Sequence, residues 1–179
     1  MEDAYLGQAT DIVLGQDFLT WLWYKSEAKG GHFATPDGET FAMYMEQRIS
    51  VQGGEGDAKE TTSVSGLMSE LKEAKAGLAL GKKVSKAQIK IELDSDVWQT
   101  TLKAEDFSQT SFKTPKVEFK QEEGDDPDAS FLEKMYLVER GMAFLDAVYF
   151  EFLKLRFSEG WDEERKKVRS WLNKNGQDD

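Results

Sequence analysis

Residues 84–103 read VSKAQIKIELDSDVWQTTLK, and this stretch decides the fold class. From Ala87 to Leu93, apolar residues alternate with polar ones, the period of two that is typical of a strand with one buried face. The turn-forming residues Asp94-Ser95-Asp96 interrupt the alternation, and a second strand pattern runs from Val97 to Lys103. The stretch therefore predicts a β-hairpin.

A first hairpin is predicted upstream of it. Residues from Thr40 to Gln52 alternate in part, the glycine-rich residues 53–57 supply a turn, and Lys59 to Ser65 have the hydroxyl and β-branched content of a solvent-facing return strand. The segment from Phe107 to Phe119 is less decided, since Pro115 breaks any helix and Val117 and Phe119 alternate as a short strand would. We expect the two hairpins to form one antiparallel sheet.

Helices are predicted on both sides of these hairpins. Gln16 to Lys29 is nearly continuous in apolar residues and is flanked by Gly15 and Gly30, which indicates a buried helix or one that meets a partner. Met68 to Leu80 carries leucine and alanine at steps of three and four and stops at Gly81. The fold class expected from strands and helices in this order is α+β.

A long helix is predicted near the C-terminus. Asp126-Pro127-Asp128 is a helix start, since aspartate caps free amides and proline suits the first turn. Ser158 and Gly160 interrupt the pattern, and a last helix follows to about Asn175. We expect an α+β domain over 1–126 and a helical segment over 127–176 that packs on it or on a partner. The long helix carries a seam of the coiled-coil type, at Phe131, Met135, Val138, Met142, Leu145, Tyr149 and Phe152.

Composition excludes several kinds of chemistry. The 179 residues include no cysteine, so disulfides, thiolate metal sites and cysteine nucleophiles are excluded. Neither a secretory signal nor an apolar stretch of about 20 residues is visible, so we expect a cytoplasmic protein outside the membrane. The net charge is −11, but residues 81–120 carry eight lysines against six acids, leaving −13 elsewhere. One net-positive segment stands out from an acidic background.

Catalytic motifs are not found. His32 is the single histidine, which excludes a catalytic triad and a histidine zinc site, and we expect it in a loop between Gly30 and Gly38. We expect no catalytic residue, metal or cofactor. The alternative is a metal-dependent nuclease built from Asp37, Glu118 and Lys120, although such fragments arise by chance in a chain with 34 acids.

The lysines of the net-positive segment are candidate contacts to double-stranded DNA. If they lie on one face, they can hold phosphates and position a duplex without reading bases. The alternative is ordinary solvation of the exposed face of a half-buried sheet, which composition alone favours. The candidates are Lys82, Lys83, Lys86, Lys90, Lys103, Lys113 and Lys116.

Apolar side chains of the two helical segments are candidates for self-association. The first predicted helix is apolar on almost all sides. The long helix is long for one domain to cover, and the extra apolar positions beside its seam leave room for a partner helix. Such residues belong more often to a core than to an interface. The candidates are Trp21, Trp23, Met135, Met142, Leu145 and Tyr149.

The order of these segments resembles the C-terminal part of the RdgC family of bacterial recombination-associated proteins. The resemblance is carried by LGQDFLTWLW at 14–23, GKKVSKAQI at 81–89, KTPKV at 113–117 and the helix from Phe131 to Leu153. It implies a non-catalytic protein that dimerises into a ring around duplex DNA, binds with little sequence preference and limits recombinase filaments. It covers about residues 14–157.

From the resemblance we expect a DNA-binding protein associated with recombination, in the cytoplasm and on the nucleoid. Because the family's N-terminal half has no counterpart in the match, we expect a homo-oligomer or a partner chain that supplies this half. The alternative is a protein-interaction or oligomerisation module that does not bind DNA directly.

Overall fold

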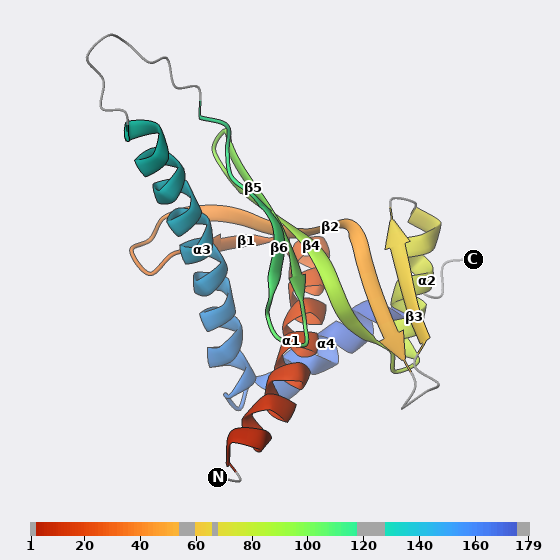
Figure 1. Cartoon of the computed structure of the whole chain (residues 1–179). Helices are drawn as coiled ribbons and strands as arrows, with labels where there is room; N and C mark the ends of the chain where they lie inside the picture. The colour runs from red at the N-terminus through yellow and green to blue at the C-terminus, as the bar shows by residue number, and fades with distance from the viewer. Residues whose placement is uncertain (1–2, 54–59, 66–67, 118–127, 175–179) are drawn as a thin grey trace.

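The computed structural model describes residues 3–53, 60–65, 68–117 and 128–174. Within them the fold is α+β, as the sequence predicts, with helices packed on an antiparallel sheet (Figure 1). The helices are α1 (Asp3–Ala28), α2 (Met68–Ala79), α3 (Ala129–Arg156) and α4 (Trp161–Lys174). The strands are β1 (His32–Ala34), β2 (Thr40–Gly53), β3 (Glu60–Ser65), β4 (Lys83–Leu93), β5 (Asp96–Lys103) and β6 (Gln109–Lys113).

Both predicted hairpins are confirmed. β5 pairs over its full length with residues 86–93 of β4, and Asp94 adopts a left-handed φ of 51° in the two-residue turn that joins them. β2 pairs with β3 along one edge and with β4 along the other, and its register shifts between Met45 and Ile49. The strand order is β1-β2-β4-β5-β6, and β1 and β3 share one edge of β2.

The segment predicted as a loop between Gly30 and Gly38 contains β1, so the prediction for His32 is wrong. His32 is the first residue of the strand and lies opposite Ala42. Gly30 and Gly31, with φ values of 75° and 63°, reverse the chain after α1 and return it alongside β2. A three-residue strand is too short to show a period of two, so no pattern in these residues indicates it.

The strand after β5 also differs from the prediction. β6 covers Gln109 to Lys113, whereas the alternation suggested a strand at Val117 and Phe119. Val117 lies outside regular structure, and Phe119 lies outside the described residues. β6 is short and largely exposed, so it lacks the buried apolar side chains that mark a strand in sequence.

The first helix begins much earlier than predicted, because Gly15 is a packing glycine and not a boundary. α1 starts at Asp3, well before the expected start at Gln16. A Cβ on Gly15 would overlap the backbone carbonyl of Ala104, so only glycine lets the helix approach the chain after β5 so closely.

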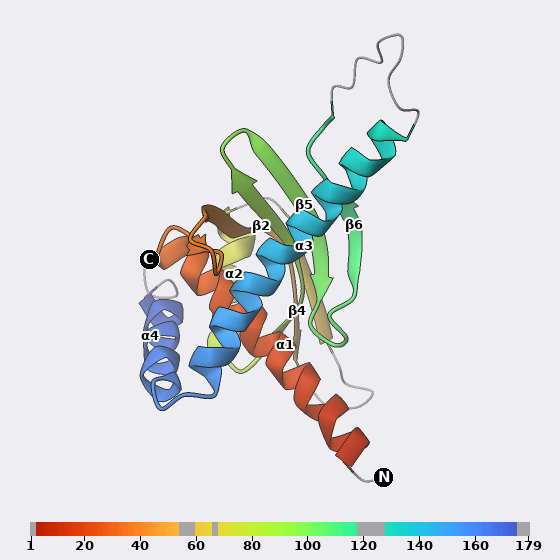
Figure 2. The ribbon, with the colours of Figure 1, turned by 90° about the vertical axis from the view of Figure 1, so that its left-hand side faces the viewer.

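All four helices lie on one side of the sheet, and the core forms between them (Figures 1 and 2). α1 packs on β2 and β4, and α4 packs on α1 and α2. α3 is held to the sheet by Trp98, whose indole N–H donates to the backbone oxygen of Leu137 at 2.8 Å. Glu27 joins α1 to α2, since it accepts hydrogen bonds from the Trp23 indole at 2.7 Å and from the Lys75 ammonium at 2.6 Å.

α3 is as long as predicted, but its buried face differs from the predicted seam. Met135 and Val138 belong to that seam, yet they are 44% and 38% exposed. The buried face is shifted around the helix because α3 lies on the sheet at an angle and meets no parallel helix. The buried residues are Leu137, Gly141, Phe144, Leu145, Val148 and Phe152.

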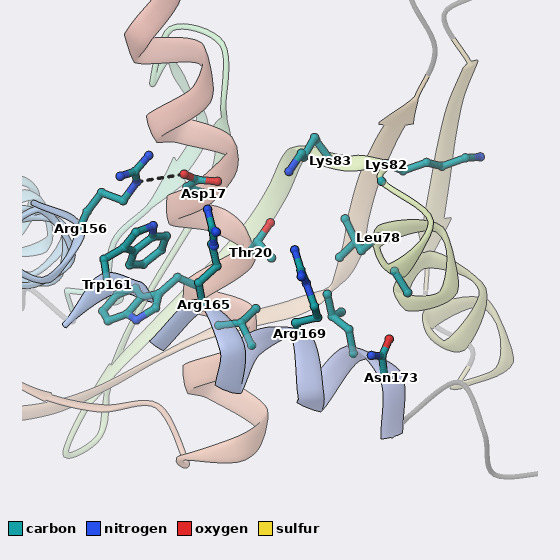
Figure 3. A pocket seen from close by; sticks show the side chains of 15 residues that line it. Asp17, Thr20, Leu78, Lys82, Lys83, Arg156, Trp161, Arg165, Arg169 and Asn173 are labelled. Carbon is teal, nitrogen blue, oxygen red and sulfur yellow. Dashed lines mark hydrogen bonds and ion pairs between the residues drawn. The ribbon is translucent and has the colours of Figure 1, made fainter. Parts of the chain in front are cut away.

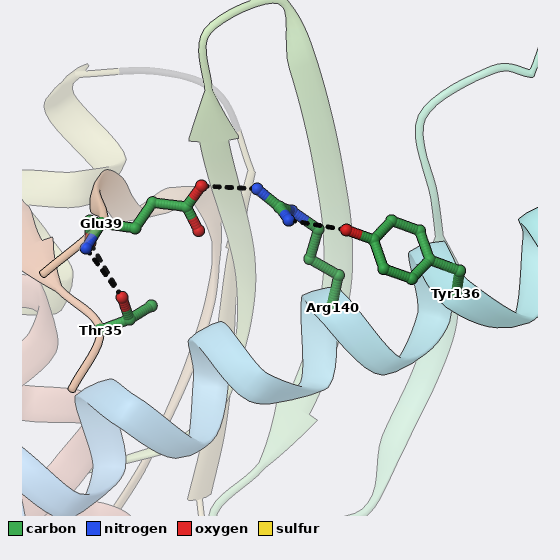
Figure 4. Close-up of polar contacts among 4 residues, drawn as sticks. All are labelled: Thr35, Glu39, Tyr136 and Arg140. Carbon is green, nitrogen blue, oxygen red and sulfur yellow. Dashed lines mark hydrogen bonds and ion pairs between the residues drawn. The ribbon is translucent and has the colours of Figure 1, made fainter. Parts of the chain in front are cut away.

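The turn between β1 and β2 is tied to the middle of α3. Arg140 donates to Glu39 at 2.6 Å and to the Tyr136 hydroxyl at 2.9 Å, and the Glu39 amide donates to the Thr35 hydroxyl at 3.0 Å (Figure 4). The guanidinium also lies 5.5 Å from the Phe144 ring centroid, within cation–π range. These contacts fix α3 over the edge of the sheet.

Candidate nucleic-acid interface

The sheet has one face that no described helix covers. Along β4 and β5, the side chains that point to the helices are buried, and those that point the other way are half-buried or exposed. Four of the seven candidate lysines belong to this open face, namely Lys86, Lys90, Lys103 and Lys113. The pairing of β4 with β5 therefore brings together Lys86 and Lys103, which are 17 residues apart in sequence.

Lys86 and Lys103 are directly opposite one another on β4 and β5. Side chains in such a pair have Cβ atoms about 5 Å apart, and like charges there are destabilising. No described carboxylate forms an ion pair with either ammonium group. Beside them, the hydroxyls of Ser50 and Ser63 lie 2.9 Å apart. An anion at this place would relieve the repulsion between the two lysines.

Lys90 is less available for a ligand, because it is already paired. Its ammonium lies 2.6 Å from the Glu92 carboxylate and 5.6 Å from the Tyr44 ring centroid. Hydrogen bonds from Lys90 and Tyr44 lower the pKa of Glu92, and the bond to Glu92 raises the pKa of Lys90. Burial raises the pKa of Tyr44. The group stays charged but internally neutralised at neutral pH.

The other candidate lysines are spread over the molecule. Lys113 lies opposite Gln99 on the outer strand, and Lys116 follows β6 and is exposed. Lys82 and Lys83 lie away from the open face, at a cavity beside the start of β4. The structure therefore does not bring all seven lysines together.

This cavity, which we call the basic cavity, lies between α1, α4 and the turn from α2 to β4 and has a volume of about 560 Å³ (Figure 3). Arg165 and Arg169 rise from α4, and Lys83 points toward them from β4. Arg156 also lines it and is paired with Asp17 at 3.0 Å. None of the three arginines is among the residues predicted from sequence, although Arg165 and Arg169 are one helical turn apart, a spacing that puts both on one face.

The candidates for self-association separate into buried and accessible residues. Three of the candidates belong to the core of this chain and are at most 6% exposed, namely Trp21, Trp23 and Leu145. Their prediction as interface residues is therefore wrong. Met142 and Tyr149 are half-buried at the sheet side of α3, where Tyr149 contacts Phe18 and Phe107. Met135 is exposed and remains available to a partner.

The nuclease candidates do not form a site in the described residues. Asp37 lies in the turn before β2, where a hydrogen bond from the Thr35 hydroxyl lowers the pKa of its carboxyl group. Glu118 and Lys120 lie outside the described residues. Within the part of the chain that the structure describes, no group of three or more histidine or acidic side chains is arranged to hold a metal ion.

Comparison with protein-family models, with curated proteins and with solved structures finds no match to this chain. Among the described helices, none has the length and apolar character needed to cross a membrane. The fold and its surfaces therefore define an α+β protein with a lysine-bearing sheet face and a basic cavity.

Proposed function

We propose that this protein binds the phosphate backbone of double-stranded DNA through the open face of its sheet, without catalysis and with little sequence preference. The observation that carries the proposal is the direct opposition of Lys86 and Lys103 on this face, with no described carboxylate paired to either. The resemblance of the segments to the RdgC family supports duplex DNA as the polyanion, and a role in recombination.

The mechanism is electrostatic. Each ammonium group that contacts a phosphate releases condensed counterions, which makes the affinity fall with salt. Hydroxyl groups on the same face add hydrogen-bond donors that fix the position of the backbone, among them Thr101 and Thr110, which lie opposite one another on β5 and β6. Among the described residues no helix lies on this face to enter a groove, so we expect contacts to the backbone and not to the bases.

The test is binding of a random-sequence duplex by wild type and by the double variant Lys86→Gln/Lys103→Gln. For the variant, we expect the slope of log affinity against log salt to be shallower by about 2, since each phosphate contact contributes about 0.9. The matched control is Lys72→Gln, an exposed lysine of α2 on the other side of the molecule. An unchanged slope, or an equal change in the control, would contradict the proposal.

A second candidate function is self-association, favoured by an apolar patch at the start of α3. Five apolar side chains there are between 38% and 62% exposed, although they lie on the same helix as the buried Leu137 and Gly141. A contiguous exposed patch of this kind is typical of a protein interface. The apolar patch consists of Phe131, Leu132, Met135, Tyr136 and Val138.

A further inference from the structure

The basic cavity is not used by the proposed DNA surface, and it differs from that surface in chemistry. Its wall includes aliphatic side chains from two helices, Leu78 of α2 and Val168 and Leu172 of α4. Each of them is 8% exposed, so each presents a small apolar area inside a cavity and not on an open surface. A cavity of about 560 Å³ is within the usual range for ligand sites.

Three cations at the opening of the cavity are available to a ligand. Lys83 and Arg169 form no ion pair with a described carboxylate, and Arg165 has only a long contact of 3.9 Å to Asp162. Figure 3 shows the three side chains pointing into the same space from β4 and α4. Lys82 points away from them, toward Glu60 at 3.7 Å.

We propose that the basic cavity binds an acidic protein segment that carries a hydrophobic side chain. The carboxylates would be held by Arg165, Arg169 and Lys83. A guanidinium group binds a carboxylate in a planar, bidentate geometry, and a lysine ammonium binds it as a point charge. The hydrophobic side chain would lie against Leu78, Val168 and Leu172. The combination of an apolar wall and a cationic opening selects for both parts of such a segment at once.

The aromatic rings of the cavity argue against a nucleotide as the ligand. Bases bound without pairing are usually held by stacking on exposed aromatic faces. Trp21 is 1% exposed, and Arg156 lies over the Trp161 ring at 5.0 Å from its centroid. Neither ring offers an open face for stacking, whereas the aliphatic wall suits a leucine or phenylalanine side chain.

The test uses a fluorescently labelled polyaspartate peptide that ends in phenylalanine, and fluorescence anisotropy with the full chain. We expect saturable binding that becomes about tenfold weaker or more when the phenylalanine is replaced by serine or the aspartates by asparagine. Arg169→Gln and Lys83→Gln should each weaken binding by a similar factor, while Lys134→Gln, on the distant part of α3, should leave it unchanged. The side chains of Arg169 and Lys83 are exposed, so both substitutions should preserve the fold.

Two outcomes would overturn the proposal. One is equal binding of the serine-ended peptide, which would show a simple polyanion site. The other is loss of duplex DNA binding in Arg169→Gln to the same extent as loss of peptide binding, which would make the cavity part of a nucleic-acid surface. Because Lys86→Gln/Lys103→Gln should leave peptide binding intact, the two proposals fail independently.

Discussion

Single glycines decide how closely the helices of this protein approach their neighbours. Gly15 lies against the carbonyl of Ala104, and Gly141 lies where α3 crosses two aromatic side chains of the sheet. A Cβ on Gly141 would be 2.6 Å from Trp98 Cδ1 and 2.8 Å from Phe112 Cζ. At such positions the cost of glycine in a helix is outweighed by the contacts that its small size permits.

Gly141→Ala should therefore destabilise the protein, although alanine is the better helix former. We expect a loss of about 1–3 kcal/mol in the free energy of unfolding, the usual range for an overpacked core, measured by urea denaturation. The control is Ala143→Gly on the exposed side of the same helix, which should cost about 1 kcal/mol through helix propensity alone. A stabilised Gly141→Ala would show that α3 does not lie this close to Trp98.

At the scale of the strand pair, β4 and β5 present two lysines that form no ion pair with a described carboxylate and one lysine that is neutralised. Lys86 and Lys103 repel one another, while Lys90 on the same strand is held by Glu92 and Tyr44. The Glu92 carboxylate thus limits the positive charge that β4 presents to a polyanion. Removing it frees one cation without changing the fold of the hairpin.

Glu92→Gln should strengthen duplex DNA binding at low salt. We expect the slope of log affinity against log salt to become steeper by about 1, the value for one added phosphate contact. The measurement is the same salt titration that tests Lys86 and Lys103, with Glu133→Gln on the exposed side of α3 as the control for net charge. If the slope becomes steeper by the same amount in both variants, the effect is one of total charge and the open face is not the DNA-binding surface.

The lowered pKa of Glu92 predicts that the stability of the protein depends on pH. Because the folded-state pKa of Glu92 is lowered by Lys90 and Tyr44, its stabilising contribution is present above the ordinary carboxyl pKa of 4.5 and is lost as the pH falls through the lowered value. Glu92→Gln should therefore be less stable than wild type at pH 7, and the difference should vanish in strong acid. A constant difference in urea denaturation at both pH values would contradict this assignment.

At the scale of the whole molecule, the chain is acidic overall, and its proposed binding surfaces lie on different elements. The net charge of −11 opposes non-specific attraction to phosphate, so the proposed DNA binding would depend on the local grouping of lysines on the open face. The apolar patch lies on α3, whereas the open face lies on β4, β5 and β6. We therefore expect separate variants to affect the proposed self-association and the proposed DNA binding.

If the apolar patch mediates self-association, Met135→Asp should shift the protein toward monomer in sedimentation velocity over a range of concentrations. Phe150→Asp is the control, since Phe150 is also exposed on α3, at 59%, but lies outside the patch. Leu145→Asp is not a useful test, because Leu145 is buried and a charge there would unfold the chain. A wild-type protein that stays monomeric at all concentrations would remove the patch as an interface.

Elements whose side chains alternate or recur over many residues could be predicted from the amino-acid sequence alone. The two hairpins, the helix that stops at Gly81, the long helix and the class of fold all followed from periods of two and of three to four. Of the candidate DNA contacts, the shared face of Lys86 and Lys90 followed from the strand period alone. These features are local, so a single sequence is enough to specify them.

Only the tertiary structure decided the features that depend on distant contacts. The true start of α1 depends on Ala104, the pairing of Lys86 with Lys103 depends on the register of β4 and β5, and the buried face of α3 depends on its crossing over Trp98. The basic cavity is the extreme case, because the cations proposed to hold a ligand come from β4 and α4, which are far apart in sequence. No pattern within either element shows that they meet, since packing brings them together.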